Sequence, residues 1–318
     1  MCAPQERAHE GVPDVGTNTV RGAFERSDSP HRSPRLARRG FLAGGLAGLS
    51  GLALAACGVA ADPASSGTQN GTGTTGSDGE GAGGGEQANS PTAQPTRGTA
   101  AEMVARATVP VLCYHQVRPW EAGDTSYNRS MLIIPPQNFG AQLDGMKAAG
   151  YTAISPAQYR EHLFFGAQLP EKPVILSFDD GKDNQISQAM PALVQREMTG
   201  TFFIMTVILG SSGWMKRDDV KRLADAGMTV ASHTWDHHMV TKYTQKDYAT
   251  QLGEPRDLLR KLSGQEVDDF AYPYGAWNQA ILPHIADAGY KCAYQLQEQP
   301  INAKHPEMTL RRILAVST

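Results

Sequence analysis

The chain has 318 residues and nearly balanced charge, with 29 Lys and Arg against 32 Asp and Glu and a formal net charge of −3. It lacks the positive surplus of proteins that bind nucleic acid, so we expect no nucleic-acid partner. Large apolar residues are scarce over the first third of the chain and common afterwards. This contrast predicts a single folded domain after a long N-terminal region.

Residues 1–57 are predicted to be an export signal. Arg38 and Arg39 precede an apolar run, rich in Gly and Ala, that lasts to Ala56 and is short for a membrane span. This arrangement resembles a twin-arginine signal, and the sequence LAAC at 54–57 resembles a bacterial lipobox. An uncleaved membrane anchor and a buried helix are the alternatives. We expect an extracytoplasmic protein that is held at the membrane by a lipid on Cys57.

Residues 58–107 are predicted to be a disordered tether, and residues 108–318 the domain. The tether is made of Gly, Ser, Thr, Ala and other small or polar residues, and Val59 is its only aliphatic residue larger than Ala before Met103. Such a segment cannot bury a core. Cys113 and Cys292 lie in apolar stretches of the domain and are expected to be buried thiols. A disulfide between them is the alternative in an oxidising compartment.

Within the domain, apolar strand-like runs alternate with segments of helical periodicity. The predicted strands are 109–115, 151–154, 174–178, 200–205, 228–231, 270–272, 291–294 and 312–316. The predicted helices are 136–150, a helix capped by Ser155, 183–196, 216–226, 245–262 and 278–288. Alternation of this kind predicts parallel βα units. Six or more units in a domain of this size favour a barrel slightly over an open doubly wound sheet.

Two adjacent carboxylates, Asp179 and Asp180, end the strand at 174–178 and are followed by Gly181. The carboxyl ends of parallel strands are where α/β folds place their active sites. Neighbouring side chains on a strand point to opposite faces, so the two aspartates have different roles unless the strand has already turned. Asp-Gly is also a common turn pair, and a plain turn is the alternative.

The strand at 228–231 leads to a pair of histidines, His233 and His237. Their spacing of four residues places both rings on one face if the segment is helical. Together with one carboxylate from the neighbouring strand end, they form a three-ligand set with open positions for a divalent cation. The second aspartate is then free to act as a base. Two polar histidines on a surface turn are the alternative.

Three short motifs resemble those of the polysaccharide deacetylase family, also called NodB-homology or carbohydrate esterase family 4. They are SFDDG at 177–181, SHTWDH at 232–237 and FAYPYG at 270–275. The resemblance covers the chain from about residue 109 to its end and implies a distorted (β/α)7 barrel. It also implies that Asp180, His233 and His237 hold the metal, that Asp179 is the general base, and that the backbone N–H of Tyr274 helps to form an oxyanion hole.

The implied activity is metal-dependent removal of N-acetyl groups from a polymer that contains N-acetylglucosamine. Zinc is the expected metal, with cobalt and nickel as alternatives, and we expect a monomer. The motif FAYPYG and the early His115 resemble the subgroup that acts on poly-β-1,6-N-acetylglucosamine, in which an early histidine lies at the site. His115 is therefore a further catalytic candidate, with a hydrogen-bonded core histidine as the alternative. Peptidoglycan and chitin-like glycans are the next substrates in order.

The chain departs from the family pattern at two places. Ala271 stands where many members have an arginine that orients the base. The sequence LRRI at 310–313 stands where many have Leu-x-x-His, whose histidine is the general acid. A catalytically impaired, lipid-anchored carbohydrate-binding protein is therefore the alternative function. Trp235 and Trp277 are candidates for stacking on sugars or for packing, and His238 is expected to face solvent.

Overall fold

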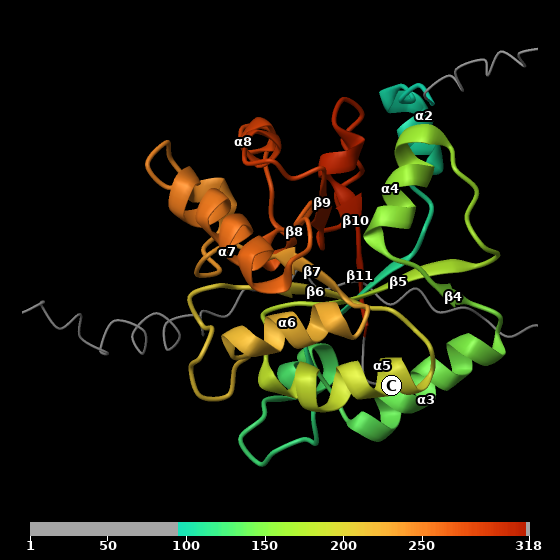
Figure 1. Cartoon of the computed structure of the whole chain (residues 1–318), viewed down its shortest axis with the longest axis vertical. Helices are drawn as coiled ribbons and strands as arrows, with labels where there is room; N and C mark the ends of the chain where they lie inside the picture. Colours follow the sequence, from blue (N-terminus) through green and yellow to red (C-terminus); the bar gives the residue numbers. More distant parts are fainter. Residues whose placement is uncertain (1–94, 316–318) are drawn as a thin grey trace, which may run out of the picture. The chain divides into compact units, whose positions relative to one another are not determined.

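The computed structural model describes residues 95–315. The predicted export signal, Cys57 and most of the predicted tether lie outside these residues. The central sheet is parallel throughout, with strand order β10-β9-β8-β7-β6-β5-β1-β11 (Figure 1). Its strands are β1 (Val111–Tyr114), β5 (Pro173–Phe178), β6 (Thr201–Ile204), β7 (Thr229–Ser232), β8 (Asp269–Ala271), β9 (Cys292–Gln295), β10 (Leu310–Arg311) and β11 (Ile313–Leu314), and β4 (Thr152–Ala153) pairs with β5.

The sheet closes through its last segment. β10 pairs with β9, and β11 pairs with β1 at the other end of the strand order. Only Arg312 separates β10 from β11, so one extended stretch of chain serves both edges. The predicted (β/α)7 barrel is confirmed. The prediction of a final strand at 312–316 was wrong in its bounds, because that strand begins at Leu310 and is shared between two neighbours.

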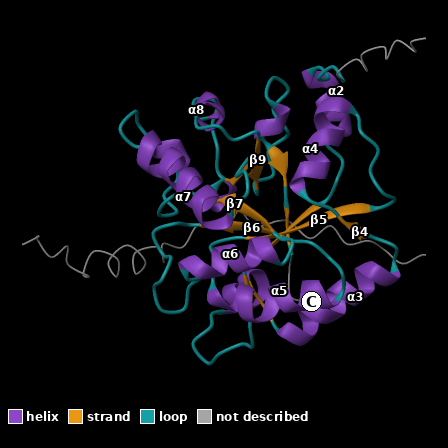
Figure 2. Ribbon diagram, viewed as in Figure 1, coloured by secondary structure: helices purple, strands orange, loops and turns teal. Residues whose placement is uncertain are grey.

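Helices surround the strands (Figure 2). They are α2 (Ala100–Arg106), α3 (Pro136–Ala148), α4 (Pro156–Phe165), α5 (Met190–Gln195), α6 (Arg217–Asp225), α7 (Glu254–Ser263) and α8 (Leu282–Asp287). Short helical turns are η1 (Asn128–Leu132), η2 (Gln185–Ala189), η3 (Val240–Lys242), η4 (Ala249–Gly253), η5 (Pro273–Gly275) and η6 (Pro306–Met308). Ser155 caps α4 as predicted, since its side chain accepts from the N–H of Gln158. None of the helices in residues 95–315 has the length and hydropathy to cross a membrane.

Several predicted helices are interrupted or shorter in the structure. The segments at 183–196 and 245–262 each divide into a π-helical turn and an α-helix, and the one at 278–288 is α-helical only over α8. α5, α7 and α8 each carry a proline in their first two positions. Because proline has no N–H to donate, regular α-helical hydrogen bonding restarts there. Between β1 and α3 the chain also forms the short parallel pair β2 (Gln116–Val117) and β3 (Ile133–Ile134).

Side chains alternate between two hydrophobic clusters, as strands covered on both faces require. Along β5, Val174 and Leu176 pack with the helices, whereas Ile175 joins the cluster in the barrel interior. Phe203 and Leu310 join that interior cluster from β6 and β10. By the same alternation Asp179 belongs on the interior side, above Ile175 and Ser177 at the carboxyl end of the barrel.

The predicted tether at residues 58–107 extends too far toward the C-terminus. Thr99 and Glu102 form a capping box that starts α2, and Met103 in this helix is 5% exposed. α2 packs against α4, and the N–H of Gly98 donates to the carbonyl of Phe164 at 2.6 Å. Residues 100–106 are therefore part of the folded domain, because Met103 supplies the apolar contact that the preceding residues lack.

Candidate metal centre and active site

Asp179 follows β5 and is almost fully buried, at 2% exposure. Arg312 donates to both of its carboxylate oxygens, with Nη1 at 2.6 Å from Oδ1 and Nη2 at 2.7 Å from Oδ2. The thiol of Cys113 donates to Oδ2 at 3.5 Å. Burial alone would raise the pKa of Asp179, but the charge of Arg312, with a smaller effect from His233, holds that pKa well below its ordinary value. Asp179 is therefore a fixed, ionised carboxylate.

The chain turns at Asp180, directly after the strand that ends beside Asp179. The φ of 78° at Asp180 lies in the left-handed region, which few non-glycine residues adopt. The Oδ1 atom lies 3.5 Å from Nε2 of His237 and 3.7 Å from Nε2 of His233. The strand has therefore turned before Asp180, and both carboxylates approach His233, but their other partners differ: Asp179 pairs with Arg312 and Asp180 lies beside His237.

His233 is buried after β7, and its orientation is fixed by the neighbouring strand. Its Nδ1 lies 2.8 Å from the carbonyl oxygen of Ala271, which can only accept, so Nδ1 carries the proton and Nε2 keeps a free lone pair. Burial lowers the pKa of His233 to about 4, and burial also lowers the pKa of His237. Both rings are therefore neutral near pH 7, as metal ligation requires.

The segment that carries His233 and His237 is not helical. Thr234 and His237 have φ values of 66°, and the hydroxyl of Thr234 accepts from the N–H of His237 at 3.0 Å. The condition of a helical segment is not met, and a tight loop instead brings the rings to 4.8 Å between centroids. Left-handed conformations at two non-glycine residues are costly and cluster at functional sites.

The donor set fits a divalent cation. Each of Asp180, His233 and His237 offers one ligand atom, and these atoms all lie within 4.8 Å of one another. Ligands around a tetrahedral zinc ion with bonds of about 2.0–2.1 Å lie about 3.3 Å apart, close to the Oδ1–Nε2 distances here. One anionic oxygen and two neutral imidazoles leave coordination positions open, which is typical of a catalytic site. The side chains of Asp180 and His237 are 21% and 22% exposed, so solvent reaches the centre.

Tyr274 lies beside this ligand set, and its ring centroid is 4.6 Å from that of His237. Its φ is 58°, and the next residue, Gly275, has a φ of 64°. A Cβ at Gly275 would lie 2.3 Å from the backbone nitrogen of Leu296, so only glycine fits there. This close approach fixes the turn that carries Tyr274. The role of its N–H toward an oxyanion remains a prediction.

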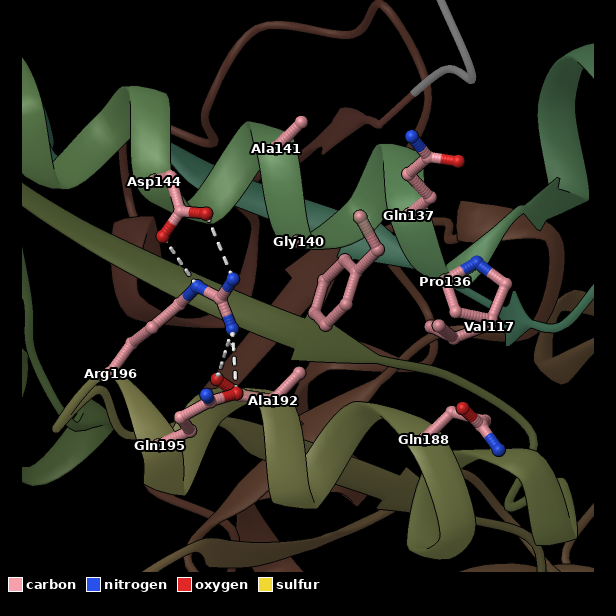
Figure 3. A pocket seen from close by; sticks show the side chains of 11 residues that line it. Val117, Pro136, Gln137, Gly140, Ala141, Asp144, Gln188, Ala192, Gln195 and Arg196 are labelled. Atoms are coloured by element: carbon pink, nitrogen blue, oxygen red, sulfur yellow. Dashed lines mark hydrogen bonds and ion pairs between the residues drawn. The ribbon is translucent and has the colours of Figure 1, made fainter.

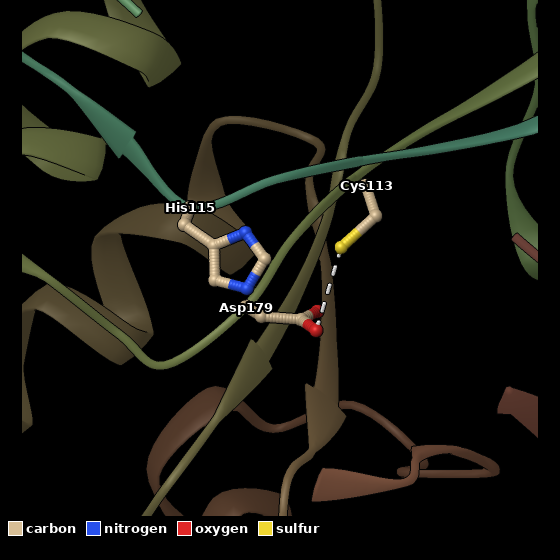
Figure 4. Close-up of side chains that lie close together, drawn as sticks. All are labelled: Cys113, His115 and Asp179. Atoms are coloured by element: carbon tan, nitrogen blue, oxygen red, sulfur yellow. Dashed lines mark hydrogen bonds between the residues drawn. The ribbon is translucent and has the colours of Figure 1, made fainter. Parts of the chain in front are cut away.

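His115 lies at the end of β1 next to Cys113 and Asp179, and the three offer ligand atoms within 4.8 Å of one another (Figure 4). Its Nδ1 is buried without a hydrogen-bond partner in residues 95–315. This cluster does not suit a second metal ion, because Arg312 already binds both oxygens of Asp179 and burial raises the pKa of the Cys113 thiol. The alternative of a hydrogen-bonded core histidine does not hold for this ring nitrogen.

Other candidates take the positions of packing or surface residues. Trp277 is 9% exposed and its indole N–H donates to Gln295, so it belongs to the core, whereas Trp235 is 38% exposed. His238 is exposed and pairs with Asp236 at 2.6 Å, as expected of a solvent-facing neighbour. Cys113 and Cys292 are free, buried thiols in the structure.

Arg312 is the residue that sequence reasoning missed. The absence of an arginine at Ala271 suggested a base without an orienting partner, yet Arg312 reaches Asp179 from the closing strand. One signal was present in the sequence: Arg312 is two residues after Leu310, so it shares the inward face of Leu310 once the predicted strand at 312–316 is extended back to that residue. The same segment, LRRI, lacks the histidine of the family but provides this cation.

A pocket of about 470 Å³ lies between α3 and the segment η2–α5 (Figure 3). Arg196 donates to both oxygens of Asp144 across it, at 2.7 and 2.8 Å. Its lining includes the amides of Gln137, Gln188 and Gln195 but none of the predicted site residues. It is an external groove, separate from the end of the barrel that carries those residues.

The domain is similar in sequence and fold to known proteins. The sequence profile described as "Polysaccharide deacetylase" matches residues 166–293, which contain Asp179, Asp180, His233, His237 and Tyr274. This part of the domain is therefore similar to the polysaccharide deacetylase family. The solved structure of the Streptococcus pyogenes deacetylase PplD in complex with acetate has the same fold, with a TM-score of 0.60 and 24% identity over 70% of this chain and 94% of that one.

Three curated relatives show the extent of the similarity. YxkH of Bacillus subtilis is 25% identical over 185 residues, 58% of this chain and 63% of YxkH. The peptidoglycan-N-acetylglucosamine deacetylase PgdA of Listeria monocytogenes is 26% identical over 174 residues, 52% of this chain and 36% of PgdA. The poly-beta-1,6-N-acetyl-D-glucosamine N-deacetylase of Staphylococcus aureus is 25% identical over 171 residues, 49% of this chain and 59% of that protein. The chain thus spans less than two thirds of each relative.

Proposed function

We propose that this protein is a polysaccharide deacetylase, a metal-dependent hydrolase that removes N-acetyl groups from a glycan containing N-acetylglucosamine. The observation that carries the proposal is the convergence of Asp180, His233 and His237 at the carboxyl end of the barrel, next to the fixed carboxylate of Asp179. A poly-β-1,6-N-acetylglucosamine-like exopolysaccharide is the favoured substrate, and peptidoglycan or a chitin-like glycan comes next. The names of the S. aureus and L. monocytogenes relatives support the first two classes.

Each side chain has a task in this proposal. A divalent cation held by Asp180, His233 and His237, zinc in the first place, would polarise the acetyl carbonyl and acidify water at the site. Asp179 accepts the proton of the attacking water on a carboxylate oxygen. The N–H of Tyr274 donates to the oxygen that becomes negative. The ring of His115, next to Asp179, is the candidate that hands a proton to the departing amine, the task of the missing family histidine.

Acetate release tests the proposal. The full chain, incubated with partly acetylated β-1,6- and β-1,4-linked glucosamine oligomers, is expected to release acetate, faster from the β-1,6 series. A chelator should stop release, and Zn²⁺ or Co²⁺ should restore it. Binding of the oligomers without release from either series, with metal present, would contradict the hydrolase and favour the carbohydrate-binding alternative.

We also propose that the protein is exported and anchored to the membrane through a lipid on Cys57. The twin arginines at 38–39 and the sequence LAAC at 54–57 support this. Fatty-acid labelling in the native host should mark the wild type and not a Cys57→Ala variant, which should appear in the soluble fraction. Equal labelling of both proteins would contradict the assignment of Cys57.

A further inference from the structure

The two adjacent aspartates lie at nearly the same distance from a metal ligand. Oδ2 of Asp179 is 3.8 Å from Nε2 of His233, and Oδ1 of Asp180 is 3.7 Å from the same atom. By distance alone either carboxylate could bind a cation beside His233. Asp180 also lies 3.5 Å from His237 and forms the ligand set with both histidines, whereas Asp179 is kept out of that set.

Arg312 makes that separation. Its side chain is fully buried, and it contacts both oxygens of Asp179 through two parallel charge-assisted hydrogen bonds. Arginine suits this task because its planar fork matches a carboxylate in geometry as well as in charge. The thiol of Cys113 adds a weak donor to Oδ2. Every one of these contacts draws the carboxylate toward the barrel interior.

The arginine itself is held by three strands. Its backbone N–H donates to the carbonyl of Gln295 in β9 at 3.1 Å, and its Cζ lies 5.2 Å from the ring centroid of Phe203 in β6. On the other side, the N–H of Ala315 donates to the carbonyl of Cys113 in β1 at 2.9 Å. The backbone that carries Arg312 is therefore fixed in the seam where the barrel closes, and its buried side chain packs beside Phe203.

We propose that Arg312 is a positioning residue that assigns the two aspartates to different tasks: it holds Asp179 off the cation, so that Asp180 is the only carboxylate ligand. Without the fork, Asp179 is free to rotate about its terminal torsion, which has a broad minimum, and to bind the cation as a second anionic ligand. The cation then gains a ligand and the reaction loses its base. The expected loss of activity rests on the proposed function, whereas the expected change in metal coordination does not.

Arg312→Lys tests the proposal, because lysine retains the charge and loses the planar fork. The Co²⁺ form of the variant is expected to show a visible spectrum of higher coordination number than the wild type, and a Co²⁺-loaded crystal structure should show Asp179 bound to the ion. The kcat for acetate release should fall roughly 100-fold, with a smaller change in KM. Arg311→Lys is the matched control, since Arg311 is the exposed neighbour on the same strand, and it should behave as the wild type.

The double variant Arg312→Lys/Asp179→Asn distinguishes positioning from general damage. It is expected to match Asp179→Asn in kcat and in Co²⁺ spectrum, because Arg312 acts through Asp179. A wild-type Co²⁺ spectrum for Arg312→Lys, together with an unmoved Asp179, would overturn the proposal. If the lysine variant does not fold, Arg312→Gln, which keeps a single donor, is read in the same way. An inactive wild type with the expected spectral change would refute the proposed function and leave this inference standing.

Discussion

Replacement of His237 by alanine is expected to weaken Zn²⁺ binding by more than about 100-fold and to abolish acetate release at limiting metal. Loss of an outer-shell partner already weakens metal binding by up to about 100-fold, and loss of a ligand should weaken it more. His237 provides one of three converging ligand atoms, and its Nε2 lies 3.5 Å from Oδ1 of Asp180. Two remaining ligands cannot hold the ion as tightly as three. Its side chain is 22% exposed, so truncation leaves little buried void compared with the fully buried His233.

The neighbouring residue gives a matched control for this variant. His238→Ala removes an identical ring one position along the same loop, where the ring is exposed and pairs with Asp236. Competition of each protein with a zinc-sensitive dye, followed by acetate release over a range of Zn²⁺ concentrations, should leave His238→Ala unchanged. Equal Zn²⁺ affinity in wild type and His237→Ala would show that the cation is held elsewhere.

Much of the barrel could be predicted because each strand leaves a local signature. The run Val174-Ile175-Leu176 is buried on both faces, and such runs in alternation with helical segments specify parallel βα units. The site could be predicted for a related reason. The carboxyl ends of neighbouring parallel strands meet at one edge, so Asp180 and the two histidines had to approach one another although more than fifty residues separate them.

What could not be predicted depends on tertiary contacts. The sequence shows that Arg312 lies in a strand, but only closure of the barrel shows that this strand serves β9 and β1 and brings its side chain to Asp179. The left-handed backbone at Asp180 and His237 is likewise imposed by the loops around them, since neither residue favours it. Local sequence patterns therefore predict which residues are the ligands. The backbone conformation that aligns these ligands, and the contact of Arg312 with Asp179, depend on tertiary packing.

The second large effect is expected for Asp179→Asn, which retains the shape of the side chain and removes its charge. Loss of the general base should lower kcat by about 10²–10⁴-fold, with Zn²⁺ still bound because Asp180, His233 and His237 remain. The change should also destabilise the fold by about 3–5 kcal/mol, since it leaves the buried guanidinium of Arg312 without its counter-charge. Kinetics must therefore be measured below the melting temperature of the variant. Asp183→Asn is the control, because it makes the same substitution at an exposed aspartate on the same turn.

The Asp179→Asn change removes both the general base and the ion pair with Arg312. The pH dependence of the unfolding free energy reports on the ion pair alone. Because the pKa of Asp179 is lower in the folded protein than in the unfolded chain, its ion pair stabilises the fold above about pH 4 and this stabilisation is lost as the pH falls below that value. Asp179→Asn has no such group to titrate, so the difference in unfolding free energy between wild type and variant should be constant near neutral pH and shrink in acid. A difference that stays the same down to pH 2 would mean that the carboxylate and Arg312 are not paired as the structure shows, and the loss of kcat would then need another cause.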